Sequence, residues 1–344
     1  MKRYSNLWTS ICNMDNLRKA HYAARRGKSH YKEVKWVNKN ENIALQNIHE
    51  LLYKKNFTTS PYEIEDRFDG KKIRTIYKLP YYPDRIVQHA LVNVCEYIWK
   101  ASFIRDTFQS IPGRGVHDAR KRVEKLIRNR DDLYVLKFDI QKYYPNINNE
   151  ILKKELRTKI KCSDTLWLID NIIDSNQGLP IGNYPSQYFG NIYLSRFDWW
   201  IKQTLKPEGY FRYCDDLVIL TNSANKAHDY RHKIFDTLNS KYKLTVKPDW
   251  QVFPIATRAL DFVGFVFSPD KIRLRKSIAK GVENKAKNIR YRSYYMTSYQ
   301  IVNGSGSYWG WCKYGGGKGL WSKNMTTDII SHIDKAKKKI KEYY

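Results

Sequence analysis

Residues 211–220 read Phe-Arg-Tyr-Cys-Asp-Asp-Leu-Val-Ile-Leu and decide the fold. Two adjacent carboxylates lie between two apolar runs, which is costly because neighbouring like charges disfavour ionisation. A strand, a tight turn and a second strand would place Asp215 and Asp216 at the tip of a hairpin. A divalent cation at that tip would explain the pair, since Mg²⁺ prefers hard oxygen ligands. A surface turn with two solvated aspartates is the alternative, and for an isolated pair it is the commoner one.

A second acidic position favours the cation. Asp139 follows an apolar stretch, residues 134–138, and precedes Tyr143-Tyr144-Pro145. An acid at the end of a strand together with an acidic pair on a hairpin is the arrangement that two-metal phosphoryl transfer needs. One ion activates the attacking hydroxyl and the other holds the leaving phosphates. The sequence therefore predicts a site built from Asp139, Asp215 and Asp216.

The flanking segments alternate between helical and extended patterns. Apolar spacing predicts helices before residue 60, over 85–99, over 117–128, from Asn148 or Asn149 onward, and over 186–205. Residues 71–79 mix basic and apolar positions, as a strand with one charged face would. Seven glycines between Gly304 and Gly319 indicate a loop. This order of elements predicts an α+β protein with more than one lobe.

Charge is the strongest signal in the composition. The chain has 344 residues, with 62 Lys and Arg against 34 Asp and Glu, and a formal net charge of +28. Such a chain repels itself unless it meets a polyanion, and nucleic-acid phosphate is the commonest one. The 27 Tyr and 10 Trp add rings that stack on bases. A basic binding protein without chemistry, such as a ribosomal or architectural protein, fits these numbers equally well.

Other classes are disfavoured by what the sequence lacks. No apolar run reaches the length of a membrane span, and the first residues lack the apolar stretch of a signal peptide. The five cysteines lie far apart without CxxC spacing, which argues against a disulfide framework or a zinc site. We therefore expect a cytoplasmic protein that has no membrane partner.

The ordered motifs resemble those of reverse transcriptases, and the Tyr-x-Asp-Asp box at 213–216 is the best-known mark of that family. The resemblance covers roughly residues 70–275. Segments 82–91 and 113–119 look like the fingers motifs of bacterial, group II intron-like enzymes, and 260–265 is similar to the primer-grip hairpin. The other matching motifs are Phe138-Asp139-Ile140, Tyr143-Tyr144-Pro145, Gln177-Gly178-Leu179-Pro180-Ile181-Gly182 and Ser186-Gln187.

The resemblance implies a right-hand polymerase fold with fingers, a palm made of an antiparallel sheet with helices, and a helical thumb. It implies N-terminal helices and fingers, with parts of the palm, over 1–125, the palm with the catalytic motifs over 126–269, and a basic thumb over 270–344. Seventeen Lys and Arg against four Asp and Glu from residue 271 onward fit a thumb that holds a duplex by its phosphates. A solvated charged helix is the alternative for this region.

Site roles follow by position. Asp139 and Asp215 would bind two Mg²⁺ ions, with Mn²⁺ as a substitute, while Asp216 would be a third acid and the Ile140 carbonyl an extra ligand. Tyr144 falls where a ring beneath the sugar rejects a 2′-hydroxyl. Further nucleotide contacts are implied at Lys72, Arg74, Ile181, Gly182 and Gln187. For Lys72 and Arg74, a solvated strand face is an equally good interpretation.

The box at 181–187 departs from the usual pattern of the family, which has Gln at the position of Ile181 and Pro at that of Gln187. An apolar-Gly-x-x-x-Ser-Gln box resembles the reverse transcriptases of diversity-generating retroelements. Those enzymes copy a template-repeat RNA with errors opposite adenine, and the cDNA diversifies a target gene. Ile cannot make the hydrogen bond of Gln, so selectivity would rest on pairing and stacking. Ile181 with Arg74 is thus the predicted fidelity determinant.

Three functions remain open on the sequence. The first is RNA-directed DNA synthesis by a mutagenic retroelement polymerase that meets template RNA, a cDNA/RNA duplex, dNTPs and a small basic accessory protein (the oligomeric accessory variability determinant). The second is a faithful group II-like, retron or phage-defence reverse transcriptase. The third is a nucleic-acid-binding protein on an inactive polymerase scaffold, which predicts a broken set of carboxylates. The set is intact.

Overall fold

The acidic pair lies between two buried strands of the computed structural model. β5 (Gly209–Tyr213) and β6 (Asp216–Thr221) flank the turn at Cys214 and Asp215, and nearly all residues of both strands are buried. Strands covered on both faces read as continuous apolar runs, which accounts for the sequence on each side of the turn. The structure describes residues 3–69 and 72–342, and only the backbone of Asp69 and Lys72.

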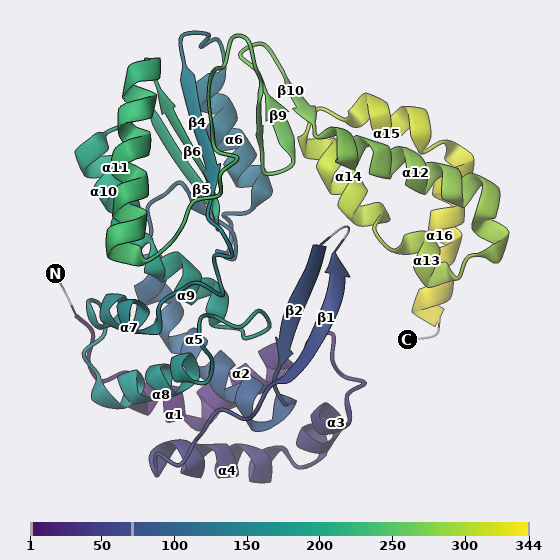
Figure 1. Cartoon of the computed structure of the whole chain (residues 1–344). Coiled ribbons are helices and arrows are strands. Elements are labelled where there is room, and N and C mark those ends of the chain that lie inside the picture. The colour runs from purple at the N-terminus through teal and green to yellow at the C-terminus, as the bar shows by residue number, and fades with distance from the viewer. Residues whose placement is uncertain (1–2, 70–71, 343–344) are drawn as a thin grey trace. The chain divides into compact units, whose positions relative to one another are not determined.

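A five-stranded sheet contains these two strands. It also includes β3 (Thr107–Phe108), β4 (Tyr134–Asp139) and β7 (Gln251–Pro254), in the order β3-β5-β6-β4-β7. Figure 1 labels its three central strands, β4, β5 and β6. β3 runs parallel to β5, whereas β4 and β7 are antiparallel. Because β4 neighbours β6, residues 139 and 216, at the ends of these two strands, meet at one edge of the sheet.

The chain divides into two compact units. Unit 1 contains residues 1–112, 138–217 and 229–250, and unit 2 contains 113–137, 218–228 and 251–344. Asp139, Asp215 and Asp216 all belong to unit 1. The site can therefore be described within that unit alone.

The N-terminal part of unit 1 is helical, as expected. The Asn13 side chain accepts a hydrogen bond from Asp15 N at 2.8 Å and caps the second helix. Leu17, Leu45 and Ile48 are fully buried and give this part its core. The elements are α1 (Trp8–Cys12), α2 (Met14–Ala24), α3 (Lys32–Lys39), α4 (Glu41–Tyr53), the short η1 (Tyr81–Arg85) and α5 (Ile86–Lys100).

An antiparallel pair of strands lies between α4 and η1 in the sequence. β1 (Glu63–Asp69) pairs with β2 (Lys72–Lys78), so the strand expected over 71–79 is present. Its apolar residues are not covered, since Ile64, Phe68 and Ile73 are 62%, 82% and 61% exposed. β1 and β2 are thus held together by the hydrogen bonds between their backbones rather than by an apolar core of their own.

Helices complete the middle of the chain. Asn148 caps the helix expected there, because its side chain accepts from Ile151 N at 3.1 Å. The single helix expected over 186–205 is interrupted at Leu194, where the backbone leaves the helical region (φ −103°, ψ 6°). The elements are α7 (Asn149–Arg157), α8 (Ser163–Asp174), α9 (Ser186–Tyr193), α10 (Ser195–Trp200), the short π-helix η2 (Ile201–Leu205) and α11 (Ala224–Tyr242).

Unit 2 combines a small sheet with a helical C-terminal region. Within the sheet, ordered β10-β9-β8, Arg275 pairs with Asp261 across two strands. The helices share an apolar core that includes Val282, Ile289 and Ile333. The elements are α6 (Val116–Ile127), β8 (Leu260–Phe262), β9 (Phe265–Phe267), β10 (Ile272–Leu274), α12 (Lys276–Arg292), the 3₁₀ turn η3 (Ser293–Tyr295), α13 (Ser298–Val302), α14 (Ser305–Tyr314), α15 (Lys318–Asn324) and α16 (Thr327–Glu342).

The prediction of a loop between Gly304 and Gly319 is wrong. Most of it is helix, α14 and the start of α15. Glycine lowers helix propensity, but packing overrides it here: the Trp311 ring lies 5.2 Å from that of Phe265 between centroids. A Cβ on Gly315 would lie 2.5 Å from the Phe265 ring, so this glycine serves close packing.

The expected α+β class is confirmed by this mixture of helices and sheets. Within the described ranges, no helix has the combination of length and apolar character needed to cross a bilayer.

Candidate active site

The acidic turn, residues 213–216, has an uncommon backbone. Cys214 has φ +58°, in the left-handed region that side chains with a Cβ rarely occupy. Its side chain is buried and 6% exposed, which leaves Asp215 and Asp216 as the half-buried polar groups of the turn. A conformation of this kind persists only where the surroundings determine it.

A buried ion pair beneath the turn supplies those surroundings. Arg212 and Asp198 are both inaccessible to solvent, with two hydrogen bonds of 2.8 and 2.6 Å between them. The same guanidinium donates to the Cys214 carbonyl at 3.3 Å, and the Tyr210 hydroxyl donates to Asp198 at 2.7 Å. Asn191, in α9, accepts from Arg212 at 3.3 Å. The turn is therefore tied through Arg212 to two helices, α9 and α10.

Backbone hydrogen bonds bring Asp139 to the turn. Ile140 N donates to the Asp215 carbonyl at 3.0 Å, directly after β4 ends. On the other side, Lys247 N donates to the Asp139 carbonyl at 2.9 Å and Gln141 N to the Thr245 carbonyl at 2.8 Å. These two bonds flank Ile140, so its own carbonyl takes no part in them.

The charges at this point are few and close together. Burial first, and then the negative charge of Asp139, raise the pKa of Asp215 above its ordinary value. The Lys247 ammonium lies 3.6 Å from an Asp139 carboxylate oxygen and partly compensates this charge. A half-buried carboxylate with a second one close beside it forms a place where a cation is favourable. Asp216, the third acid, is the first residue of β6. Among the described residues, no three or more His, Cys, Asp or Glu side chains lie close enough together to hold a metal ion.

A cavity of about 610 Å³ opens beside the turn. It brings together four of the residues expected from the sequence: Arg74, Tyr144, Ile181 and Asp215. The others do not line it within the described part of the chain. Lys72 lies in β2 as expected, but its side chain is outside the described residues. The remaining lining residues are Ile73, Thr75, Tyr77, Gln109, Lys142, Tyr143, Pro145, Asn176, Gln177, Leu179, Tyr213 and Cys214.

Tyr144 is held from behind by a glycine of α9. A Cβ on Gly190 would lie 3.3 Å from Cε1 of the Tyr144 ring, so the ring rests on the bare backbone of the helix. The neighbouring Tyr143 hydroxyl donates to the Gly190 carbonyl at 2.6 Å. Burial, followed by the nearby Cys214, raises the pKa of Tyr144 far above its ordinary value. The ring is therefore a neutral, fixed wall of the cavity.

The segment around Ile181 is fastened to β2. Tyr77 N donates to the Ile181 carbonyl at 2.8 Å, and Leu179 N donates to the Tyr144 carbonyl at 2.9 Å. Gly182 has φ +132°, and a Cβ there would lie 2.1 Å from the Tyr77 carbonyl oxygen, so only glycine fits. Arg74 and Tyr77 both lie in β2, and Tyr77 is bonded to Ile181, so β2 fixes the position of Ile181 relative to Arg74.

Gln187 is placed differently. It is exposed in the first turn of α9 and does not line the cavity, although Ser186 and Tyr188 on either side are buried. Gly182 likewise contributes its backbone fit to Tyr77 rather than a wall of the cavity.

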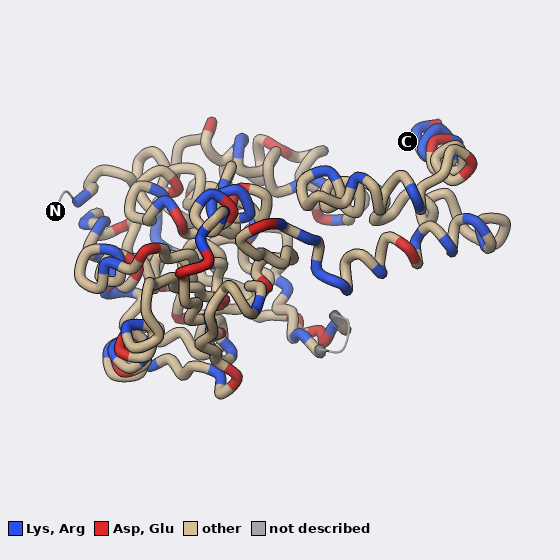
Figure 2. The backbone as a smooth tube through the Cα atoms, turned by 90° about the horizontal axis from the view of Figure 1, so that it is seen from above, with Lys and Arg blue, Asp and Glu red and all other residues tan. Residues whose placement is uncertain are grey.

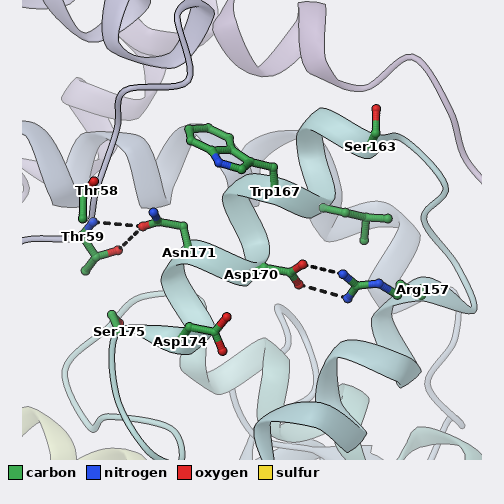
Figure 3. Close-up of a pocket in the computed structure, with 10 residues that line it drawn as sticks. Thr58, Thr59, Arg157, Ser163, Trp167, Asp170, Asn171, Asp174 and Ser175 are labelled. Carbon is green, nitrogen blue, oxygen red and sulfur yellow. Dashed lines mark hydrogen bonds and ion pairs between the residues drawn. The ribbon is translucent and has the colours of Figure 1, made fainter.

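A second pocket, of about 740 Å³, contains none of the expected residues (Figure 3). Its polar groups are already engaged: Arg157 pairs with both carboxylate oxygens of Asp170, and the Asn171 side chain accepts from Thr59 N at 2.9 Å (Figure 3). Such internally satisfied groups leave little to bind a charged ligand, so we place the chemistry at the acidic turn.

Sequence reasoning missed three supports of the site. Arg212 could have been recognised, because a lone cation inside an otherwise apolar strand must find a buried partner. Its partner Asp198 and the cation Lys247 had no such signal, since their roles depend on pairings far along the chain.

Comparisons with known proteins agree with the motifs. The family model described as reverse transcriptase (RNA-dependent DNA polymerase) matches residues 64–267. Protein YkfC of Escherichia coli (strain K12) is 22% identical over 232 residues, which is 54% of this chain and 61% of that protein.

Similar solved structures include the truncated apo telomerase of Candida tropicalis (14% identity, 65% of this chain and 58% of that one, TM-score 0.49). Another is the Candida albicans telomerase with a TWJ fragment of telomeric RNA (12% identity, 83% and 61%, TM-score 0.47). The chain spans about three fifths of the length of these relatives.

Proposed function

The chain belongs to the reverse transcriptase (RNA-dependent DNA polymerase) family, and from this premise we propose that it copies RNA into DNA at the acidic turn. The observation that carries the proposal is the meeting of Asp139 and Asp215 beside a cavity lined by Arg74 and Tyr144. We also propose a right-hand division, with N-terminal helices and fingers, including parts of the palm, over 1–125, the palm with the catalytic motifs over 126–269 and a basic thumb over 270–344.

The residues fit divalent cations. Asp139 and Asp215 offer hard oxygens, and Mg²⁺ commonly takes one or two carboxylates and completes its shell with water and substrate phosphate. Burial first, and then the charge of Asp139, raise the pKa of Asp215, and a bound cation would offset both effects. We propose two Mg²⁺ ions, replaceable by Mn²⁺, with Asp216 and the Ile140 carbonyl as additional ligands. When bound, the ions would acidify the attacking 3′-hydroxyl and stabilise the leaving pyrophosphate.

The protein's own contribution is positioning. Arg74 lies on the cavity wall where its guanidinium can hold a triphosphate by two parallel hydrogen bonds, and we propose the same role for Lys72. The Tyr144 ring, fixed against Gly190, would lie beneath the sugar and exclude a 2′-hydroxyl. Lys247 neutralises Asp139 in the absence of substrate.

Primer extension on an RNA template tests this proposal. Asp139→Asn and Asp215→Asn should each lower the rate of DNA synthesis by about 10³-fold or more, since several kcal/mol of charge stabilisation are lost. Asp249→Asn is the matched control, because this exposed aspartate lies in the same unit. Full activity of Asp215→Asn would refute the assignment.

The box around Ile181 supports a finer proposal, error-prone copying opposite adenine for the diversification of a target gene. Ile181 lines the cavity beside Arg74 but offers no hydrogen bond to template or nucleotide. Correct and incorrect pairs then differ only by pairing and stacking, which discriminate less strongly. A faithful group II-like, retron or phage-defence enzyme is the alternative.

Sequencing the cDNA made on an adenine-containing RNA separates the two. Ile181→Gln should lower misincorporation opposite adenine, whereas Ile181→Leu, which keeps the apolar character, should leave it unchanged. Equal error rates in wild type and Ile181→Gln would favour the faithful enzyme. Gln187, which is exposed, should have the smaller effect on errors when it is replaced by Pro.

A small basic accessory protein is the remaining partner that we propose, besides template RNA, the cDNA/RNA duplex and dNTPs. Two basic proteins repel each other, and this chain carries +28. Added salt screens that repulsion but weakens nucleic-acid binding. Direct docking should therefore tighten with salt between about 50 and 200 mM, whereas a complex bridged by RNA should dissociate.

A further inference from the structure

Four tyrosines project from one short stretch of unit 2. Tyr291, Tyr294, Tyr295 and Tyr299 are 74%, 92%, 85% and 70% exposed. They lie at the end of α12, in η3 and in α13; Figure 1 labels the two helices. We call these four residues the tyrosine patch. Large rings so fully exposed and so close in sequence are unusual, because each leaves apolar surface in water.

The backbone under the tyrosine patch is fixed on both sides. Ile289 and Ile301 are buried in the helical core of unit 2. Thr297 and Gln300 form a capping box at the start of α13, with hydrogen bonds of 3.1 and 2.9 Å. The rings of Tyr294 and Tyr295 lie edge to face at 5.4 Å. The rings are thus presented by an ordered scaffold.

The sequence around the tyrosine patch is basic, although Asp328 lies near Arg290, which also donates to the Thr326 hydroxyl at 3.2 Å. Between Glu283 and Asp328 the sequence contains no acidic residue but seven Lys and Arg. Lys287, Arg290 and Arg292 are exposed and lie within four residues of Tyr291 in the sequence; Figure 2 shows Lys and Arg in blue along the backbone, with Asp and Glu in red among them. Aromatic rings interleaved with cations complement a strand with flat bases and charged phosphates.

We propose that the tyrosine patch binds single-stranded RNA, with bases stacked on the rings and phosphates on Lys287, Arg290 and Arg292. A duplex keeps its bases stacked inside and presents its backbone, so exposed rings would add little to duplex binding. The choice of RNA rests on the proposed function, in which the unpaired strand is the RNA template ahead of copying. An acidic protein would pair with the cations but has no need of four rings.

The test measures equilibrium binding of the full chain to a fluorescent single-stranded RNA, without divalent ions or nucleotides. Replacing all four tyrosines by Ser should weaken binding by about tenfold or more, since each stacked base contributes substantially. The Tyr→Phe version should bind like wild type. Tyr53→Ser is the matched control, because Tyr53 is 72% exposed on α4 in unit 1.

Salt and duplex experiments separate rings from charges. The Ser variant should keep the salt dependence of wild type, whereas Lys287→Gln/Arg290→Gln/Arg292→Gln should reduce its slope by about 2, at about 0.7 for each phosphate contact. Affinity for an RNA–DNA duplex should be unchanged in the Ser variant. A thermal melt of each variant checks its fold.

The proposal is overturned if the Ser variant binds single-stranded RNA like wild type, or loses duplex binding equally. It is also overturned if only binding to polyglutamate falls, which would indicate an acidic protein as partner. Primer extension by the wild type is scored separately. An inactive wild type with tyrosine-dependent RNA binding would reject the proposed function alone, whereas an active one with tyrosine-independent binding would reject this inference alone.

Discussion

The acidic turn and the tyrosine patch use their side chains in opposite ways. At the turn, Arg212 and Asp198 are fully buried and hydrogen-bonded to each other, and Arg212 also donates to the Cys214 carbonyl. The rings of the tyrosine patch and the cations that flank it in the sequence face solvent, on a scaffold that needs none of them for its core. Phosphoryl transfer needs a few atoms held in fixed positions. Binding a long nucleic-acid strand needs many contacts, each of which can form with any base or phosphate of the strand.

The largest difference that we expect between the two regions is in how much a substitution lowers the free energy of unfolding. Arg212→Met leaves Asp198 buried without its partner, and such a loss costs about 3–5 kcal/mol. We expect a free energy of unfolding lower by that order in denaturant titrations, together with loss of DNA synthesis. Arg292→Met, next to Tyr291 of the tyrosine patch, should change stability by less than about 0.5 kcal/mol. Equal costs at the two positions would contradict the contrast.

A smaller effect is expected from pH. Burial lowers the pKa of His89 to about 4, and its ring stacks on Tyr184 at 3.9 Å. The folded state therefore favours the neutral ring. The unfolded chain takes up the proton below its ordinary pKa near 6.5, so stability from this group is present above that pH and is lost as the pH falls towards 4. Between pH 7 and 5 the loss should be about 2 kcal/mol.

The His89→Phe variant removes this group and should show a flatter stability profile over the same range. His232→Phe is the matched control, since His232 is exposed in α11. The same slope in wild type and His89→Phe would show that other groups set the acid limit.

Gly190→Ala should alter selectivity with little effect on the fold. The added methyl group meets the Tyr144 ring at 3.3 Å and moves it by a few tenths of an ångström. We expect the preference for deoxynucleotides over ribonucleotides to fall by about tenfold, equivalent to about 1.4 kcal/mol. Competition between dNTP and rNTP in primer extension measures this ratio. An unchanged ratio would remove Tyr144 from sugar selection.

The smallest effect belongs to the ion pair of unit 2. Arg275 and Asp261 are 40% and 47% exposed, unlike the fully buried pair at the turn. Arg275→Gln should therefore cost only about 0.2–1 kcal/mol of unfolding free energy. A cost as large as that of Arg212→Met would mean that burial does not separate the two pairs.

Local patterns predicted much of this molecule. The apolar runs around the acidic pair indicated β5 and β6, and Asn148 marked the start of α7, because these signals lie within a few residues of each other. The glycine-rich segment misled, since the helix α14 is decided by packing of Trp311 against Phe265. The break at Leu194 had no local signal either.

The site was predictable where motifs name residues and not where pairing is distant. Tyr144, Ile181, Arg74 and Asp215 do share one cavity. The exposed position of Gln187 did not follow from its place in the box. Asp198 and Lys247 could not be found in advance, because a carboxylate or an ammonium on a helix or loop looks the same whether it faces solvent or a partner many residues away.

The central claim is that Asp215 holds a divalent cation for RNA-templated DNA synthesis, and a change of ligand tests it most directly. Asp215→Cys replaces a hard oxygen by a soft sulfur, which Mg²⁺ disfavours and Mn²⁺ accepts better. In Mg²⁺, primer extension by Asp215→Cys should be nearly abolished. Replacing Mg²⁺ by Mn²⁺ should raise the rate of this variant at least about tenfold more than it raises the rate of the wild type. Wild-type rates for Asp215→Cys in Mg²⁺ would contradict the account.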